Sequence, residues 1–148
     1  MPRFSARSNA NLRTCHPDLQ TLFRIVVEDY DCSVICGHRD QAAQDQVYHA
    51  GLSQVQWPDS LHNKVPSLAA DVVPWPLDWK DRESFYHFAG YVRGIAQCLF
   101  DTQGISVSSK MKYKIRSGAD WDGDKNLHDQ TFMDLPHFEL IGVEDKLS

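Results

Sequence analysis

The sequence predicts an α+β fold in one compact domain, with a small antiparallel sheet and about three helices. The chain has 148 residues, of which 42% are hydrophobic, enough for one domain with its own core. Segments with helical spacing of apolar residues are mixed with short strand-like runs in no repeating order. No repeat, low-complexity tract or linker divides the chain. One domain covering residues 1–148 is therefore the simplest expectation.

Three segments have the periodicity of amphipathic helices. Apolar residues recur at helical spacing from residue 17 to about residue 30, and Pro17 suits the first turn. A second helix is expected over residues 40–50, where Gly51 can provide the C-terminal cap. The third should run over about residues 81–100, since its apolar residues trace a single face.

Four short segments have the character of strands. Residues 34–36 form a short apolar run after the first helix, and residues 68–73 form another that ends at a Pro-Trp-Pro sequence. Apolar residues alternate with basic ones over residues 111–116, as in a half-exposed strand. Residues 138–141 provide the last strand, and antiparallel pairing is expected.

Charge and composition exclude several classes of partner. Twenty acidic residues against 15 basic ones give a net charge of −5, which repels a polyphosphate, so no nucleic-acid partner is expected. The N-terminus lacks the apolar stretch of a signal peptide, and no run is long enough for a membrane span. We therefore expect synthesis in a cytoplasm, no stable membrane insertion and four reduced cysteines.

The main functional signal comes from two histidine-bearing stretches, residues 60–71 and 134–140. Within them, His62, Asp71 and His137 supply two imidazoles and one carboxylate, a ligand set that leaves the fourth position of a tetrahedral Zn²⁺ open. A carboxylate inside an apolar strand is costly unless a cation or hydrogen bonds compensate, and a metal ion would do so. Taken singly, Asp71 could instead cap a turn or pair with an arginine, and His137 could be structural.

Five motifs carry a resemblance to a known family, the first of them together with Gln44, and His16-Pro17-Asp18-Leu19 extends the likeness upstream, so that it covers about residues 16–140. They are Gly37-His38-Arg39, Ser60-Leu61-His62, Ala69-Ala70-Asp71, Gly118-Ala119-Asp120-Trp121 and Asp134-Leu135-Pro136-His137-Phe138-Glu139. These motifs resemble those of the zinc peptidases of the D-Ala-D-Ala carboxypeptidase and L-alanyl-D-glutamate endopeptidase type, which include phage endolysins. One departure is the step of nine positions from His62 to Asp71, which is longer than in many relatives.

The resemblance implies the fold of the Hedgehog and D-Ala-D-Ala peptidase domains, with zinc on His62, Asp71 and His137 and with Asp134 as the catalytic acid and base. The implied function is a zinc-dependent peptidoglycan hydrolase that cleaves the stem peptide, first an L-alanyl-D-glutamate endopeptidase acting as a phage endolysin. Such an enzyme would be a monomer without a separate cell-wall-binding domain. It would be made in the host cytoplasm and would reach the cell wall after the membrane is permeabilised.

Alternative functions remain at this point. A D-Ala-D-Ala carboxypeptidase of the same family would share the ligands and differ only in its pocket. A non-catalytic zinc-binding recognition module is a second alternative, although it would not need an acid and base at Asp134. A metal nuclease is a third, against which the net charge of −5 counts.

Several further residues have two interpretations each. Arg39 could hold a developing oxyanion or a substrate carboxylate, or it could form a surface salt bridge. Ser60 could bind substrate, orient a metal-binding histidine or stabilise a turn. His38 could touch substrate beside Arg39, Trp121 could line a substrate groove or cover the core, and Asp134 could close an Asx-turn.

A second ion is also considered. Asp120, Asp122, Asp124 and Asn126 offer oxygen ligands at alternate positions, which resembles the opening of a calcium loop. The register is incomplete, because an EF-hand loop would have Gly at its sixth position, where this chain has Lys125. The segment is therefore either a Ca²⁺ site or a solvated acidic turn.

Overall fold

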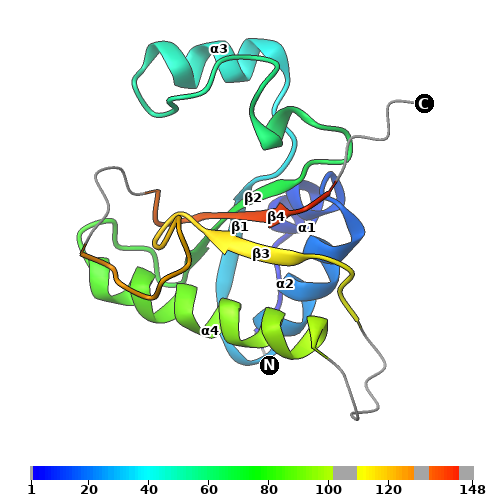
Figure 1. Ribbon diagram of the computed structural model, residues 1–148, viewed down its shortest axis with the longest axis vertical. Coiled ribbons are helices and arrows are strands. Elements are labelled where there is room, and N and C mark those ends of the chain that lie inside the picture. The colour runs from blue at the N-terminus through cyan, green and yellow to red at the C-terminus, as the bar shows by residue number, and fades with distance from the viewer. Residues whose placement is uncertain (1, 102–109, 129–133, 144–148) are drawn as a thin grey trace.

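A four-stranded antiparallel sheet in the order β1-β2-β4-β3 forms the centre of the fold (Figure 1). The computed structural model describes residues 2–101, 110–128 and 134–143. The strands are β1 (Cys32–Cys36), β2 (Ala69–Pro74), β3 (Lys114–Ser117) and β4 (His137–Ile141). The last strand in the sequence thus lies inside the sheet, between the second and the third.

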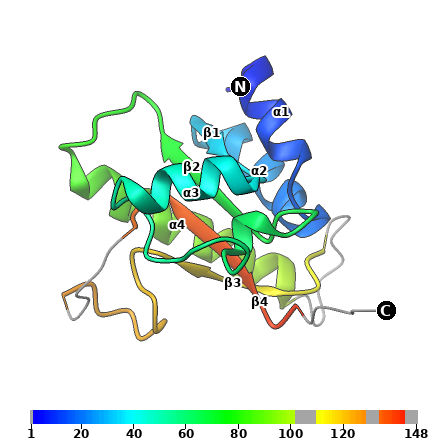
Figure 2. The same ribbon diagram turned by 90° about the horizontal axis from the view of Figure 1, so that it is seen from above.

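Helices cover the sheet unequally. The helices are α1 (Ala6–Arg13), α2 (Pro17–Asp29), α3 (Gln41–His49) and α4 (Arg82–Phe100), with a short 3-10 helix η1 (Leu61–Asn63) before β2. Helices α2 and α4 pack against each other, and α4 also contacts β2 and β3. Helix α3 lies on the other side of the sheet, as the two perpendicular views show (Figures 1 and 2). Among the described residues, no helix has both the length and the apolar character needed to cross a membrane.

The alternation of side chains along the two central strands separates the core from the face toward α3. Phe138 of β4 is fully buried and packs edge-on against Phe23 of α2 and Phe88 of α4, with ring centroids 5.5 and 6.0 Å apart. Because neighbouring residues of a strand point to opposite faces, His137 and Glu139 are directed away from this core. The same alternation in β2 places Ala70 and Val72 in the core and Asp71 on the opposite face.

The expected α+β class with a small antiparallel sheet is confirmed, and the described residues contain four α-helices, one more than the three located from the sequence. Helix α1 was missed because its sequence is mostly polar and buries only Ser8 and Leu12, so its apolar periodicity is weak. Its start is set instead by a capping bond, in which Ser5 Oγ accepts from the Ser8 N–H at 3.1 Å.

Strand β3 begins later than the alternation over residues 111–116 predicts. The N–H groups of Lys112 and Tyr113 both donate to Asp18 Oδ2, at 2.8 and 2.9 Å. This buried carboxylate in the first turn of α2 takes the backbone donors that a strand would use. The pairing with β4 therefore starts only at Lys114.

Two glycines provide opposite tests of this packing. Gly94 is exposed in the middle of α4, and a Cβ built there has open space around it. We expect Gly94→Ala to raise the free energy of unfolding by about 0.5–1 kcal/mol, because alanine loses less backbone freedom in a helix. Gly37→Ala should destabilise, since its Cβ would collide with Asn11 O and Thr14 Oγ1. Chemical denaturation of both variants measures the two shifts, and equal signs would contradict the packing described.

Candidate metal centre and active site

The sheet register itself brings the metal-binding candidates together. Asp71 of β2 pairs with His137 of β4 on one side and with Cys36 of β1 on the other. The second pairing depends on an irregularity in β1, where the register shifts between Val34 and Cys36, a local distortion that often occurs beside active sites. The fourth side chain, that of His62, comes from η1.

Two imidazoles converge on a single carboxylate oxygen. His62 Nε2 lies 3.2 Å from Asp71 Oδ1, and His137 Nδ1 lies 3.4 Å from the same atom. All three side chains are largely buried, with exposed fractions of 3%, 14% and 11%. The predicted set of His62, Asp71 and His137 is thus brought together in space, although its first and last members lie 75 positions apart in the sequence.

In each imidazole, one nitrogen faces Asp71 and the other points away from it. The hydrogen bond of the nitrogen that points away determines which of the two carries the proton. His62 Nδ1 lies 2.7 Å from the Gly37 carbonyl, which can only accept, so Nδ1 carries the proton. His137 Nε2 likewise donates to Glu139 Oε1 at 2.9 Å. The inward nitrogens, Nε2 of His62 and Nδ1 of His137, are therefore the atoms with lone pairs to offer. Two oriented imidazoles and a carboxylate form a donor set that fits Zn²⁺.

The same contacts alter the protonation of the three groups. Burial disfavours the charge on Asp71, but the two histidines outweigh burial and hold the pKa of its carboxyl far below the usual range. Burial also disfavours charge on His62, yet Asp71 raises the pKa of this imidazole to about 10. The pKa of His137 is raised in the same way, by Asp71 and Glu139 against the effect of burial. Without an ion, the cluster therefore retains protons that an ion would displace.

Asp134 lies at the edge of this cluster. Its Oδ2 atom is 3.8 Å from His137 Nδ1, and its side chain is 32% exposed, more than that of the three ligand candidates. Burial and the nearby Asp71 raise the pKa of its carboxyl. The backbone position is fixed by the Asp134 N–H, which donates to the Gly118 carbonyl at 3.1 Å. Gly118 suits this close approach, because a Cβ there would collide with the backbone of Asp134.

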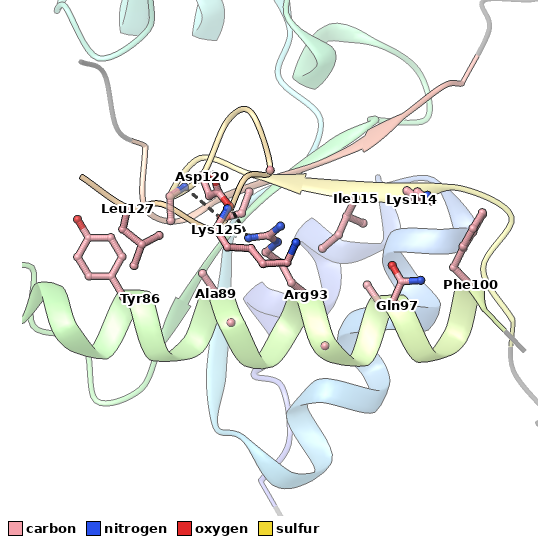
Figure 3. Close-up of a pocket in the computed structure, with 16 residues that line it drawn as sticks. Tyr86, Ala89, Arg93, Gln97, Phe100, Lys114, Ile115, Asp120, Lys125 and Leu127 are labelled. Atoms are coloured by element: carbon pink, nitrogen blue, oxygen red, sulfur yellow. Dashed lines mark hydrogen bonds and ion pairs between the residues drawn. The ribbon is translucent and has the colours of Figure 1, made fainter. Parts of the chain in front are cut away.

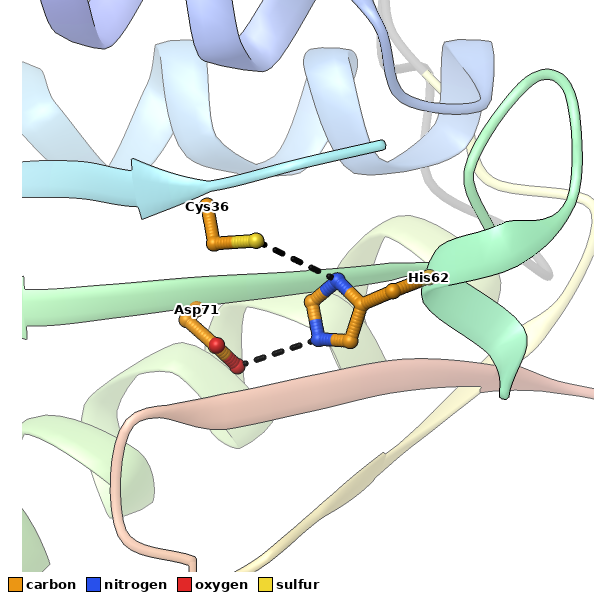
Figure 4. Close-up of side chains that lie close together, drawn as sticks. All are labelled: Cys36, His62 and Asp71. Carbon is orange, nitrogen blue, oxygen red and sulfur yellow. Dashed lines mark hydrogen bonds and ion pairs between the residues drawn. The ribbon is translucent and has the colours of Figure 1, made fainter. Parts of the chain in front are cut away.

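Arg39 and Cys36 lie on the other side of Asp71. Arg39 Nη2 is 3.5 Å from Asp71 Oδ2 and 3.7 Å from Cys36 Sγ. Cys36 Sγ in turn lies 3.8 Å from His62 Nδ1 (Figure 4). Cys36, His62 and Asp71 form a second possible ligand group beside that of Asp71, Asp134 and His137. Burial disfavours a thiolate, but the contacts with His62 and Arg39 lower the pKa of Cys36 overall.

Arg39, His62, Asp71, Asp134 and His137 line one cleft with a volume of about 1140 Å³. The cleft also contains Ser60, Trp121 and the residues that follow α3. The phage L-alanyl-D-glutamate peptidase family matches residues 1–141 of the chain. This chain belongs to that family.

Individual members support the assignment. The L-alanyl-D-glutamate peptidase of Escherichia phage T5 is 28% identical over 147 residues, which span 94% of this chain and 98% of that protein. Among solved structures, the L-Ala D-Glu endopeptidase ChiX of Serratia marcescens is 30% identical, with a TM-score of 0.66. The match covers 93% of this chain and 89% of ChiX. The family resemblance and the fold expected from it are thus confirmed.

Other predicted residues of this family member take distinct positions. Ser60 is the N-cap of η1, where its Oγ accepts from the His62 N–H at 3.2 Å, so it orients the backbone of a ligand candidate. The Trp121 ring lies 5.3 Å from the His137 ring between centroids. His38 lies outside the set of described residues that line the cleft, and its N–H donates to Thr14 Oγ1 at 2.8 Å.

The sequence argument did not assign a role to Glu139 or Arg116. Glu139 Oε1 accepts from His137, while its Oε2 accepts from Arg116 Nη2 at 2.8 Å. Arg116 also lies over the Trp121 ring, 5.6 Å from its centroid. The alternation in β4 predicts that Glu139 shares a face with His137 two positions before it. The sequence therefore contained a signal for Glu139, but it did not identify Arg116 of β3 as its partner.

Removing the charge of Glu139 should weaken metal binding by this family member. We expect Glu139→Gln to lower zinc affinity by about 10–100-fold, as is typical when the partner of a metal-binding histidine is altered. Glu83→Gln, in the exposed first turn of α4, is the matched control and should leave the affinity unchanged. Competition with a chromophoric chelator measures both. Equal affinities for Glu139→Gln and the native chain would show that Glu139 does not support the site.

The acidic loop after β3 brings together three of its four predicted ligands. Carboxylate oxygens of Asp120, Asp122 and Asp124 lie within 4.8 Å of one another, whereas the side chain of Asn126 accepts from the His128 N–H at 3.0 Å. Asp120 is buried, and its Oδ2 accepts from Arg93 Nη1 at 2.8 Å in a groove between α4 and β3 (Figure 3). The Oδ1 atom of Asp120 is buried without a hydrogen-bond partner among the described residues.

Proposed function

We propose that this chain is a zinc-dependent L-alanyl-D-glutamate endopeptidase that cleaves the peptidoglycan stem peptide, as a phage endolysin does. The observation that carries the proposal is the convergence of two oriented imidazoles and one carboxylate beside Asp134 in an open cleft. Membership of the phage L-alanyl-D-glutamate peptidase family supports the choice of bond. His62, Asp71 and His137 would hold the ion.

The protein side chains would divide the reaction between them. When bound, zinc supplies Lewis-acid polarisation of the scissile carbonyl and makes water more acidic. Asp134 accepts a proton from the attacking water and then delivers it to the leaving amine of D-Glu, so that one carboxyl serves as base and then as acid. Its raised pKa brings this carboxyl closer to neutral pH, where such a transfer is most effective.

Arg39 and Trp121 would hold the substrate. Arg39 presents a permanently charged guanidinium next to Asp71, where it can stabilise negative charge that develops on the scissile carbonyl oxygen. Trp121 offers an aromatic wall beside His137. Ser60 would stabilise the turn that carries His62, because its hydroxyl accepts from the His62 N–H as the N-cap of η1.

The cleaved bond can be determined from the new chain ends. Purified peptidoglycan is incubated with the zinc-loaded protein, and new amino and carboxyl ends are identified after labelling. New D-Glu amino ends together with L-Ala carboxyl ends are expected. Free D-Ala would instead assign the D-Ala-D-Ala carboxypeptidase, and binding to peptidoglycan without any release would assign a recognition module.

The cell-wall partner and the place of action follow from the same proposal. We propose that the protein works as a monomer, which is supported by the convergence of His62, Asp71, His137 and Asp134 of a single chain in the cleft. We propose that the protein is made in the host cytoplasm and reaches the stem peptide after permeabilisation of the membrane. Intact host cells should therefore resist the added protein, whereas cells with a permeabilised membrane should lyse.

Calcium is proposed as a second ion, on the loop of Asp120, Asp122 and Asp124. The supporting observation beyond the three carboxylates is the partnerless, buried Oδ1 atom of Asp120. Added Ca²⁺ should raise the melting temperature of the native protein, because a ligand that binds only the folded state stabilises it. Asp124→Asn should reduce that shift, and an equal shift with Mg²⁺ would contradict a calcium site.

A further inference from the structure

A buried amide in α3, that of Gln44, uses all of its hydrogen-bonding positions. Gln44 is fully buried, although most polar side chains of α3 are exposed. Its Oε1 accepts from Arg39 Nη1 at 2.9 Å and from Asn63 Nδ2 at 3.2 Å. Its Nε2 donates to the Val55 carbonyl at 2.6 Å and to Ser53 Oγ at 3.1 Å. A primary amide has two donors and two accepting lone pairs, so its capacity is fully used.

The bond from Arg39 Nη1 acts on the guanidinium beside the metal centre. Gln44 holds Nη1 of Arg39, while Nη2 of the same group lies 3.5 Å from Asp71 Oδ2. Because a guanidinium is planar and rigid, fixing the direction of one nitrogen fixes that of the others. Arg39 thus has its donors aimed before a substrate arrives, which removes a cost of ordering from the reaction.

The other two bonds hold one edge of the cleft. Ser53 and Val55 both line it. Ser53 Oγ accepts from the Val55 N–H at 3.1 Å, so the two residues form one hydrogen-bonded turn. The amide of Gln44 therefore connects the edge of the cleft to Arg39 through a single side chain.

Asn63 extends this connection to the metal-binding segment. Its Nδ2 donates to the Arg39 carbonyl at 3.0 Å as well as to Gln44. Asn63 directly follows His62 in η1, and the Arg39 N–H donates to the His62 carbonyl at 2.8 Å. Gln44 is thus the buried junction of α3, the edge of the cleft and η1.

We propose that Gln44 is a positioning residue for the peptidase reaction, which aims the Arg39 guanidinium at the reacting carbonyl and holds residues 53–55 at the edge of the cleft. This inference rests on the proposed function, because it concerns the role of Arg39 toward the substrate. Gln44 touches no reacting atom, since it lies buried behind Arg39.

A double-mutant cycle on peptidoglycan hydrolysis tests the first part. Gln44→Met keeps a similar volume and removes the four bonds. In the native background it should lower kcat by about 10²-fold, the effect of a misplaced catalytic group. In an Arg39→Lys background it should lower kcat by less than about threefold, because lysine lacks the planar guanidinium that the amide aligns. Gln46→Met, on the exposed side of the same helix, is the control and should match the native enzyme.

Gln44→Glu separates the two parts of the proposal. A carboxylate can still accept from Arg39 and Asn63, but it cannot donate to the Val55 carbonyl. We therefore expect kcat near the native value and a raised KM. A merely structural role would change both constants and the melting temperature in every variant, without this division.

The outcomes distinguish a failure of the Gln44 proposal from a failure of the proposed function. If the native enzyme releases no new D-Glu amino ends, the proposed function fails. If the native enzyme is active but Gln44→Met lowers kcat equally in both backgrounds, the positioning role of Gln44 is overturned. If Gln44→Met does not fold, Gln44→Glu decides, because a loss of kcat as large as that of Arg39→Lys would also overturn it.

Discussion

Replacing Asp134 with asparagine should lower kcat on peptidoglycan by about 10²–10⁴-fold, the usual contribution of a positioned general acid and base. Asparagine has nearly the same shape and can still accept a hydrogen bond, but it cannot take up a proton at neutral pH. The change therefore removes proton transfer while leaving the cleft almost unaltered. The release of new D-Glu amino ends over time gives kcat, and the zinc content is measured on the same samples.

Zinc retention distinguishes a catalytic role from metal binding, because Asp134 lies close enough to Asp71 and His137 to be a ligand itself. A catalytic acid and base leaves the zinc content near that of the native protein, whereas a ligand role lowers zinc content and activity together. Asp45→Asn, an exposed carboxylate on α3, is the matched control and should be fully active. Full activity of Asp134→Asn would remove Asp134 from the mechanism.

The elements that sequence periodicity predicted well are those with a continuous apolar face. Helix α4, for example, was expected over about residues 81–100 and forms over Arg82–Phe100. Its buried side chains recur at helical spacing and leave little choice of structure. Helix α1 lacked such a face, and strand β3 was shortened by a tertiary contact from Asp18 that no local pattern contains.

The candidate site shows the same division between local and tertiary information. The convergence of His62, Asp71 and His137 could be predicted, since few arrangements tolerate a carboxylate in an apolar strand. The partners that orient them were not predictable, because the Gly37 carbonyl and Arg116 become neighbours only through the sheet register and the position of η1. Gln44 is the extreme case, a glutamine whose role depends on four partners from three segments.

Zinc affinity should rise steeply with pH, and Asp71 should determine how steeply. Zinc binds unprotonated imidazole, so binding releases every proton that the metal-free histidines hold. In the metal-free protein the pKa of His62 is raised to about 10, so His62 is protonated at neutral pH, and the raised pKa of His137 makes it keep its proton to a higher pH than an ordinary imidazole. Each displaced proton makes the affinity about tenfold greater per pH unit below the pKa of its group. The affinity therefore falls as the pH is lowered.

Asp71→Asn separates the two effects of this carboxylate. Loss of a direct ligand should lower zinc affinity at neutral pH by more than loss of a residue that only hydrogen-bonds to a ligand, which typically costs about 10–100-fold. Activity should be lost together with the zinc. Loss of the charge also removes what holds protons on His62 and His137, so the pKa of each falls and fewer protons are displaced. The remaining affinity should thus depend less on pH than in the native protein. Chelator competition between about pH 6 and 8 measures both slopes, and a native affinity that stays flat across this range would contradict protonated histidines at the metal centre.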